Sequence, residues 1–136
     1  MTTANQTDPA KRNKQLLETA FAEAAKGNNR LFSALFADDI VYSKIGTTDW
    51  SKTYRGRPEV FGMFRRLLDV LDGPHITIAH RLIAEDNVVV VEASSRSRTK
   101  AGNPYENTYC LVYRLDDGMV KEVKEYCDTA LIEAVL

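Results

Sequence analysis

The second half of the chain contains four β-rich segments separated by short turn signals. These segments cover residues 75–84, 87–99, 105–115 and 119–128. Ala101-Gly102 and Asp116-Asp117-Gly118 lie between them and are typical of tight hairpin turns. The spacing predicts an antiparallel meander. Such a sheet must bury one of its faces against another layer.

Helices that could form this layer are predicted in the first half of the chain. The first begins at Asp8-Pro9, because Asp caps free amides and Pro fits the first turn, and runs to about Lys26. A short second helix follows Asn28 or Asn29, and a third begins at Gly56-Arg57-Pro58. Short strands are expected at residues 40–45 and 53–55. Helices followed by a meander predict an α+β fold, with a curved sheet wrapped as a cone around three N-terminal helices and room for a pocket between them.

The chain of 136 residues is long enough for one domain. We expect a flexible tail over residues 1–9 and a single domain over 10–136. The formal net charge of −1 provides no basic excess for phosphates, so nucleic acid is not an expected partner. No apolar run approaches the roughly 20 residues that span a bilayer, and the polar N-terminus has no signal segment. A cytoplasmic protein that does not bind membranes is therefore expected.

The cysteines and histidines do not form a recognisable metal motif. Cys110 and Cys127 have no CxxC partner and are interpreted as reduced, small apolar residues. His75 and His80 are five residues apart, so they do not share one face of a strand. Neither a metal nor another cofactor is expected.

The hairpins predict which polar residues share a face of the sheet. A two-residue turn at Ala101-Gly102 would place Lys100 opposite Asn103, and a three-residue loop over 116–118 would place Leu115 opposite Met119. Tyr109 would then face Glu125. One face would carry Glu92, Ser94, Arg96, Asn107, Tyr109, Leu111, Val123, Glu125 and Cys127. A slip of one residue would exchange the two faces.

This face would bring together groups suited to acid–base chemistry, if it points inward. Glu92 and Glu125 could divide the roles of acid and base, because a carboxylate in an apolar cone has its charged form disfavoured. Tyr109 or Arg96 could stabilise a developing oxyanion. If the same face points outward, the charges form a solvated ladder across the strands.

The only tryptophan has two possible roles. Trp50 lies in a polar loop over residues 46–52, where it could cover the pocket mouth and stack on a flat ligand. It could equally plug the open end of the cone.

Four short runs resemble the SnoaL-like and ketosteroid-isomerase-related branch of the nuclear transport factor two-like superfamily. The similarity extends from about Lys14 to Leu136. The runs, in chain order, are Leu35-Phe36-Ala37-Asp38-Asp39-Ile40-Val41-Tyr42, Tyr54-Arg55-Gly56-Arg57, Asp117-Gly118-Met119-Val120-Lys121-Glu122 and Glu125-Tyr126-Cys127-Asp128-Thr129-Ala130-Leu131. The resemblance implies a cystatin-like α+β cone, a homodimer through the sheet and a deep apolar pocket. It also implies acid–base catalysis without a cofactor.

Individual residues match the family's sites only in part. Glu125-Tyr126-Cys127-Asp128 is similar to the Asp-Tyr-Phe-Asp run of limonene-epoxide-hydrolase-like members, which makes Glu125 the matching carboxylate. Their Arg-x-Asp is replaced here by Glu92-Ala93-Ser94. Ketosteroid isomerases use a tyrosine and an acid as an oxyanion hole; Tyr42 or Tyr109 and Glu92 or Glu125 could correspond.

The resulting expectation is a small-molecule enzyme, an isomerase, cyclase, dehydratase or hydrolase, acting on an apolar carbonyl-type substrate. Glu125, Glu92, Tyr109 and Arg96 are the candidate catalytic residues. Trp50, Tyr42, Asn107 and Phe64 are the candidate ligand-binding residues. The alternative is a non-catalytic ligand-binding or dimeric adaptor module of the same fold.

Overall fold

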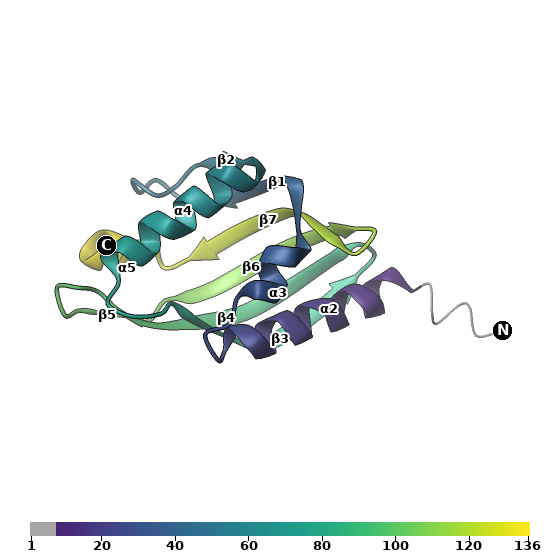
Figure 1. Ribbon diagram of the computed structural model, residues 1–136, viewed down its shortest axis with the longest axis horizontal. Helices are drawn as coiled ribbons and strands as arrows, with labels where there is room; N and C mark the ends of the chain where they lie inside the picture. The colour runs from purple at the N-terminus through teal and green to yellow at the C-terminus, as the bar shows by residue number, and fades with distance from the viewer. Residues whose placement is uncertain (1–7) are drawn as a thin grey trace.

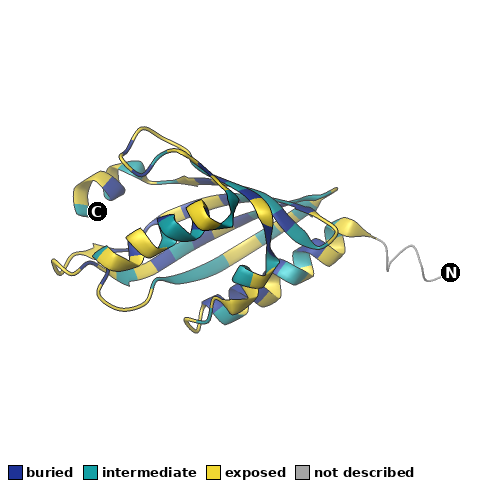
Figure 2. Cartoon of the chain, turned by 45° about the horizontal axis from the view of Figure 1, so that its top comes forward, coloured by how far each residue is buried: buried dark blue, intermediate teal, exposed yellow. Residues whose placement is uncertain are grey.

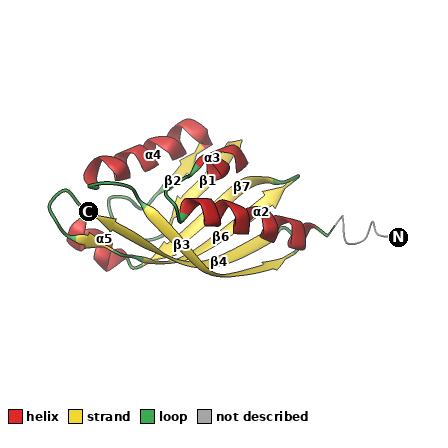
Figure 3. Cartoon of the chain, turned by 60° about the horizontal axis from the view of Figure 1, so that its bottom comes forward, coloured by secondary structure: helices red, strands yellow, loops and turns green. Residues whose placement is uncertain are grey.

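The computed structural model describes residues 8–136, in which helices cover one face of a curved sheet (Figures 1 and 3). The helices are α2 (Pro9–Ala24), α3 (Arg30–Leu35), α4 (Gly56–Val70) and α5 (Thr129–Val135). The strands are β1 (Phe36–Lys44), β2 (Thr53–Arg55), β3 (Ile76–Glu85), β4 (Val88–Arg98), β5 (Pro104–Tyr105), β6 (Thr108–Asp116) and β7 (Met119–Cys127). The predicted α+β class is confirmed.

The sheet is mixed because its first long strand pairs with its last. Within the described residues the strand order is β2-β1-β7-β6-β4-β3, with β5 paired to β4. β1 and β7 are parallel, whereas the other pairs are antiparallel. Segments from the two halves of the chain therefore lie side by side in the middle of the sheet.

Helix α2 begins where the sequence predicts a cap. The Asp8 side chain accepts a hydrogen bond from the amide of Ala10, and Pro9 occupies the first turn. Leu17, Phe21 and Ala24 form its buried stripe. The helix thus starts one residue before the predicted domain boundary at residue 10. Most of the predicted tail, residues 1–7, lies outside the described residues.

The hairpin between β4 and β5 differs from the prediction by one residue. Thr99 and Asn103 close a three-residue loop through an amide-to-carbonyl bond of 2.8 Å, with Gly102 at a φ of 93°. Ala93 therefore faces Tyr109, and Glu92 faces Cys110. Because side chains alternate, the one-residue difference moves Glu92, Ser94 and Arg96 to the opposite face of β4.

The hairpin between β6 and β7 also differs, but the predicted face is kept. Asp117 and Gly118 form a two-residue turn with φ of 50° and 76°, and the pairing shifts once more between Arg114 and Leu115. Together these two shifts move the pairing of β6 with β7 by two residues, so each side chain stays on its predicted face. Glu125 consequently pairs with Leu111 rather than Tyr109, yet it stays on the inner face.

Two apolar clusters hold these layers together, as the burial colours of Figure 2 indicate. The larger cluster fills the space between the sheet and helices α2 and α4. The smaller one lies toward α5 and contains Trp50, Leu67, Leu71, Tyr105 and Ile132. Across residues 8–136, no helix has the length and apolarity needed to span a membrane.

Candidate functional site

A cavity of about 360 Å³ lies between the inner face of the sheet and the helices. Two of its lining residues, Asn29 before α3 and Leu68 near the end of α4, are exposed and mark its mouth. Nearly half of its lining residues are aromatic, which suits a flat apolar ligand. The aromatic lining residues are Phe21, Phe32, Phe36, Tyr42, Phe61, Phe64, Tyr109 and Tyr113.

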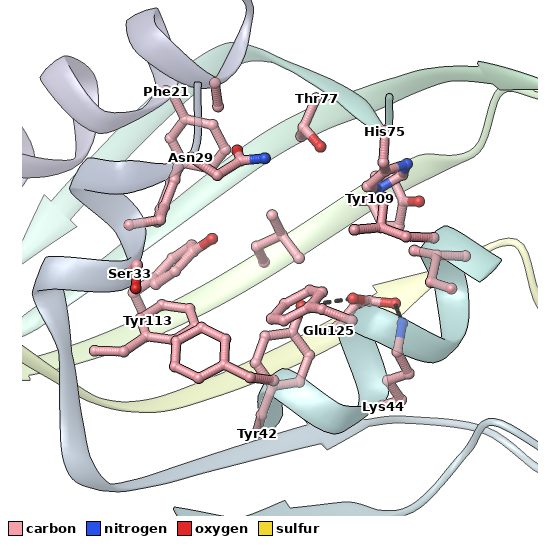
Figure 4. Close-up of a pocket in the computed structure, with 18 residues that line it drawn as sticks. Phe21, Asn29, Ser33, Tyr42, Lys44, His75, Thr77, Tyr109, Tyr113 and Glu125 are labelled. Carbon is pink, nitrogen blue, oxygen red and sulfur yellow. Dashed lines mark hydrogen bonds and ion pairs between the residues drawn. The ribbon is translucent and has the colours of Figure 1, made fainter. Parts of the chain in front are cut away.

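Glu125 is the carboxylate in this cavity, and both of its oxygens are engaged. Tyr42 donates its hydroxyl to Oε1 at 2.6 Å, and Lys44 donates from Nζ to Oε2 at 2.9 Å (Figure 4). Glu125 is 4% exposed. A buried charge of this kind needs a counterion and hydrogen bonds, and Lys44 and Tyr42 supply them.

The parallel pairing of β1 and β7 builds this cluster. Lys44 lies directly beside Glu125 in the register, and Tyr42 lies two residues before Lys44 on the same face. The cluster therefore depends on strand alternation in β1 and on one long-range pairing. The loop that follows β1 is fastened by the amide of Ile45, which donates to the carbonyl of Glu125 at 3.0 Å.

The ion pair fixes the protonation of its basic partner. Burial alone would lower the pKa of Lys44, but the charge of Glu125 and its hydrogen bond outweigh that effect and raise the pKa above its ordinary value. Burial and the adjacent Glu125 charge raise the pKa of Tyr42 well above its usual value. Lys44 is thus an ammonium at neutral pH, and Tyr42 is a neutral donor.

His75, just before β3, is a second polar group in the cavity wall. Its Nδ1 lies 2.8 Å from the hydroxyl of Ser97, and its ring stacks on Tyr105. Burial, with a smaller effect of the Lys44 charge, lowers the pKa of His75 to about 4. The ring is therefore neutral at pH 7. Figure 4 shows it on the same side of the cavity as Glu125 and Lys44.

Tyr109 lines the cavity, as predicted, but its hydroxyl is already engaged. Its oxygen lies 3.3 Å from the hydroxyl of Ser95 and 3.2 Å from the hydroxyl of Tyr105, and its single proton serves one of these two hydrogen bonds. Burial raises the pKa of Tyr109 far above its usual range, so the hydroxyl stays protonated. It would have to leave this network to bind an oxyanion.

The inward orientation predicted for Glu92 and Arg96 is wrong. Glu92 is exposed on the outer face and accepts a 2.8 Å bond from Arg81. Arg96 is exposed as well. The three-residue loop at 100–102 is the physical reason, because it moves both side chains away from the cavity. Neither residue lines the site.

Two candidate ligand-binding residues, Trp50 and Asn107, do not line the cavity either. Trp50 is buried in the smaller apolar cluster, with the guanidinium of Arg66 stacked on its ring, so it plugs one end of the fold. Asn107 is fully buried, and its side chain binds the backbone of Thr108 and Asp128. By contrast, Tyr42 and Phe64 do line the cavity, as expected.

Lys44, His75 and Tyr113 are among the lining residues that were not predicted. Alternation with Tyr42 was a signal for Lys44, but only the pairing of β1 with β7 shows which carboxylate it meets. His75 has no motif in the sequence. Tyr113 follows Tyr109 and Leu111 at the strand period of two, which was a usable signal. In the part of the chain that is described, no three His, Cys, Asp or Glu side chains cluster as a metal site would require.

The comparisons with known proteins agree with this geometry. A family model for the SnoaL-like domain matches residues 17–123. No curated protein sequence matches the chain. Among solved structures, Bal32a from a soil-derived mobile gene cassette superimposes with a TM-score of 0.82 at 17% identity, over 93% of this chain and 98% of that one.

Two further solved structures are similar. A protein from Jannaschia sp. CCS1 that is named as a SnoaL-like polyketide cyclase has a TM-score of 0.79 at 12% identity, over 95% of this chain and 94% of its own. TerC, co-crystallised with polyporic acid, has a TM-score of 0.77 at 14% identity, over 90% and 96%. At these identities the structures establish the fold alone, whereas the family model covers most of the sequence. The chain therefore belongs to the SnoaL-like domain family.

Proposed function

We propose that this chain is a small-molecule enzyme in which Glu125 moves a proton to and from an apolar, carbonyl-type substrate. The reaction would be an isomerisation, cyclisation, dehydration or hydrolysis that needs no cofactor. The single observation that carries the proposal is a carboxylate, 4% exposed, inside a largely apolar cavity of about 360 Å³. Proton transfer by such a positioned side chain contributes about 100- to 10,000-fold to a rate.

The neighbours of Glu125 would divide the remaining work. When Glu125 accepts a proton from carbon next to a carbonyl, negative charge develops on the carbonyl oxygen. The Lys44 ammonium then faces that charge, since its partner carboxylate has been neutralised. Tyr42 fixes the orientation of the carboxyl group. Because the raised pKa keeps Lys44 protonated, it is not suited to act as an amine nucleophile.

His75 offers a second polar contact for the substrate. If Ser97 donates to Nδ1, the other ring nitrogen carries a proton and can donate to a carbonyl oxygen. If Nδ1 donates to Ser97 instead, the other ring nitrogen, Nε2, carries no proton and can accept one. In both tautomers the neutral ring complements the ion pair of Glu125 and Lys44. The two groups could therefore serve as base and hydrogen-bond donor to one substrate.

Two similar structures support the choice of ligand. TerC was crystallised with polyporic acid, and the Jannaschia protein is named as a polyketide cyclase. Polyporic acid and polyketides are organic molecules, and a largely apolar cavity would suit ligands of that kind. At 14% and 12% identity they support the class of ligand and not a particular reaction.

Ligand binding without turnover is the second candidate function, and one observation favours it. The donors nearest Glu125 are already used: Tyr42 binds the carboxylate, and Tyr109 binds Ser95 and Tyr105. A binding module needs only a polar anchor in an apolar cavity. Measuring turnover and binding on the same variants separates the two functions.

The test combines Glu125→Gln with a matched control, Glu92→Gln on the outer face. Wild type is screened against enones, epoxides and hydroxy-ketones, and the best substrate is carried forward. Glu125→Gln should lower kcat by about 100-fold or more, while the control keeps the wild-type rate. Full activity in Glu125→Gln contradicts the proposal, and binding without turnover in wild type supports the second candidate.

Stability has to be measured alongside activity, because the Gln leaves Lys44 without a counterion. Removing one partner of a buried pair costs about 3 kcal/mol or more. The double variant Lys44→Met/Glu125→Gln removes the orphaned charge and should recover part of that loss in chemical denaturation. If this more stable double variant is still inactive, the loss of activity comes from the missing catalytic groups and not from unfolding.

A further inference from the structure

The hydroxyl of Tyr113 is the exception among the buried tyrosines. Tyr113 is 4% exposed, and its ring packs against Phe21 and Phe32, with centroids 6.1 and 6.3 Å away. It lines the cavity, yet within residues 8–136 no protein group hydrogen-bonds its hydroxyl. The other buried tyrosine hydroxyls all have partners; they belong to Tyr42, Tyr54, Tyr105 and Tyr109.

An unpartnered hydroxyl in a cavity wall calls for a physical explanation. Most buried polar groups in proteins are hydrogen-bonded, and leaving one unpaired is costly. The aromatic neighbours of Tyr113 provide no acceptor. Burial raises the pKa of Tyr113 beyond its usual range, with a smaller effect from Glu125, so the group remains a donor at neutral pH. Among the described residues, the one fully buried side-chain atom without a partner is Asn13 Oδ1, so the Tyr113 hydroxyl is open to the cavity. Its acceptor must therefore come from the water or ligand that fills the cavity.

This donor lies apart from the acid–base groups. Tyr113 pairs with Val123, two residues along β6 from Leu111, which pairs with Glu125. Two residues of a strand span about 7 Å. Figure 4 shows Tyr113 on the side of Phe21 and Ser33, whereas Glu125, Lys44, His75 and Tyr109 gather on the other side. The cavity thus has two hydrogen-bonding ends with apolar walls between them.

We propose that Tyr113 is a second ligand-binding group, whose hydroxyl donates to an oxygen at the end of the ligand remote from Glu125. The inference deepens the proposed function and rests on it for the use of the cavity. It specifies the substrate class as flat, apolar, ring-containing compounds that carry oxygen at both ends. A carbonyl, ether or phenol oxygen would satisfy Tyr113, and the proton-transfer centre would lie at the opposite end.

The test uses two fluorescent probes that differ by one oxygen, 2-naphthol and 2,6-dihydroxynaphthalene. Their Kd values are measured by fluorescence titration with wild type, Tyr113→Phe and Tyr109→Phe. The ratio of the two Kd values cancels the ring contacts that both probes share. Tyr113→Phe should reduce the preference for the dihydroxy compound about 3- to 10-fold, the value of one hydrogen bond. Tyr109→Phe should keep the wild-type preference, because its hydroxyl is paired within the protein.

A second measurement does not depend on any probe. Without ligand, Tyr113→Phe should unfold at the same or a higher denaturant concentration than wild type, because it removes an unpaired polar atom. Tyr109→Phe should be destabilised. A clear stability loss in Tyr113→Phe would overturn the inference, since it would mean that the hydroxyl has a partner inside the protein.

The remaining outcomes distinguish this inference from the acid–base proposal. An unchanged preference in Tyr113→Phe, or no binding of either naphthol to wild type, overturns the role of Tyr113. These readouts need no turnover, so they stand even if Glu125→Gln keeps its activity. Conversely, a catalytic Glu125 with an unaltered naphthol preference leaves the acid–base proposal intact and rejects the second binding group.

Discussion

The pKa of His75 depends strongly on the position of its ring in the cavity wall. The ring is covered by the stacked Tyr105 and by the hydroxyl of Ser97, and it lies near the charge of Lys44. Burial is the main cause that disfavours a positive imidazolium, the charge of Lys44 adds to it, and the charge of Glu125 opposes it. The native state therefore resists protonation, whereas the unfolded chain accepts a proton near pH 6.5.

This difference predicts a pH dependence of stability. The folded pKa of about 4 lies below the unfolded value of 6.5, so the contribution of His75 is fully present above pH 6.5 and is lost as the pH falls toward 4. The loss should amount to about 1–2 kcal/mol once solvent screening of the partly exposed ring is allowed for. Urea unfolding of wild type and His75→Gln between pH 7 and 4 measures it. The variant should lose this part of the pH dependence, and His80→Gln, an exposed control, should not; equal slopes for all three proteins would contradict the assignment.

The sequence could identify some site residues and not others. Glu125 and Tyr109 face inward, as the sequence predicted. Their prediction depends only on which face of a strand they occupy, and two one-residue shifts in the β6–β7 hairpin together leave that face unchanged. Glu92 and Arg96 were misplaced because one extra loop residue reverses a whole strand. Lys44 could not be assigned to Glu125, since nothing local reports a parallel pairing between residues 81 positions apart.

Among the elements, the hairpin loop over residues 100–102 has the largest effect on the site. Its length determines which face of β4 meets the helices, and Gly102 makes the loop possible through its φ of 93°. A side chain there would meet no atom within 4 Å, so any cost of substitution arises from the backbone alone. L-residues pay about 1–2 kcal/mol for this left-handed conformation.

Gly102→Val should therefore destabilise the protein by about 1–2 kcal/mol. The matched control is Gly62→Ala in α4, where the backbone is helical and the nearest atom is 3.8 Å from the added carbon. That change should be neutral or stabilising by up to about 1 kcal/mol. Chemical denaturation compares the two. A Gly102→Val protein as stable as wild type would show that the loop is not strained by a side chain.

The elements themselves were predicted more accurately than their pairing. Helix starts at Asp8-Pro9 and Gly56 follow from capping and proline rules, and both are observed. The second helix ends at Leu35, and Phe36 begins β1, where its ring packs against Phe61 and Phe64 of α4. Tertiary contacts of this kind carry no local signal.

At the scale of the whole molecule, none of the helices in the described part of the chain covers the outer face of the sheet, which is only partly polar. Ile83 and Tyr126 are 55% and 43% exposed there, beside the ion pair of Arg81 and Glu92. Large exposed apolar side chains grouped with charges are typical of association surfaces. The homodimer expected from the family resemblance is proposed to form through this face.

Sedimentation velocity tests the homodimer. Wild type should sediment with the mass of two chains, and Tyr126→Asp should raise the dimer Kd about tenfold or more by placing a charge in an apolar contact. Lys100→Asp, in the exposed hairpin loop, is the control and should sediment like wild type. A monomeric wild type, or an undisturbed Tyr126→Asp dimer, would count against this use of the outer face.

The link between Lys44 and Glu125 spans 81 positions of the chain. Either residue alone would be a desolvated ion without compensation, so neither strand can settle into its final place before the other arrives. Formation of the buried ion pair and pairing of β1 with β7 are consequently one cooperative event. A partially synthesised chain that ends before β7 would lack Glu125, and Lys44 would then have no buried counterion.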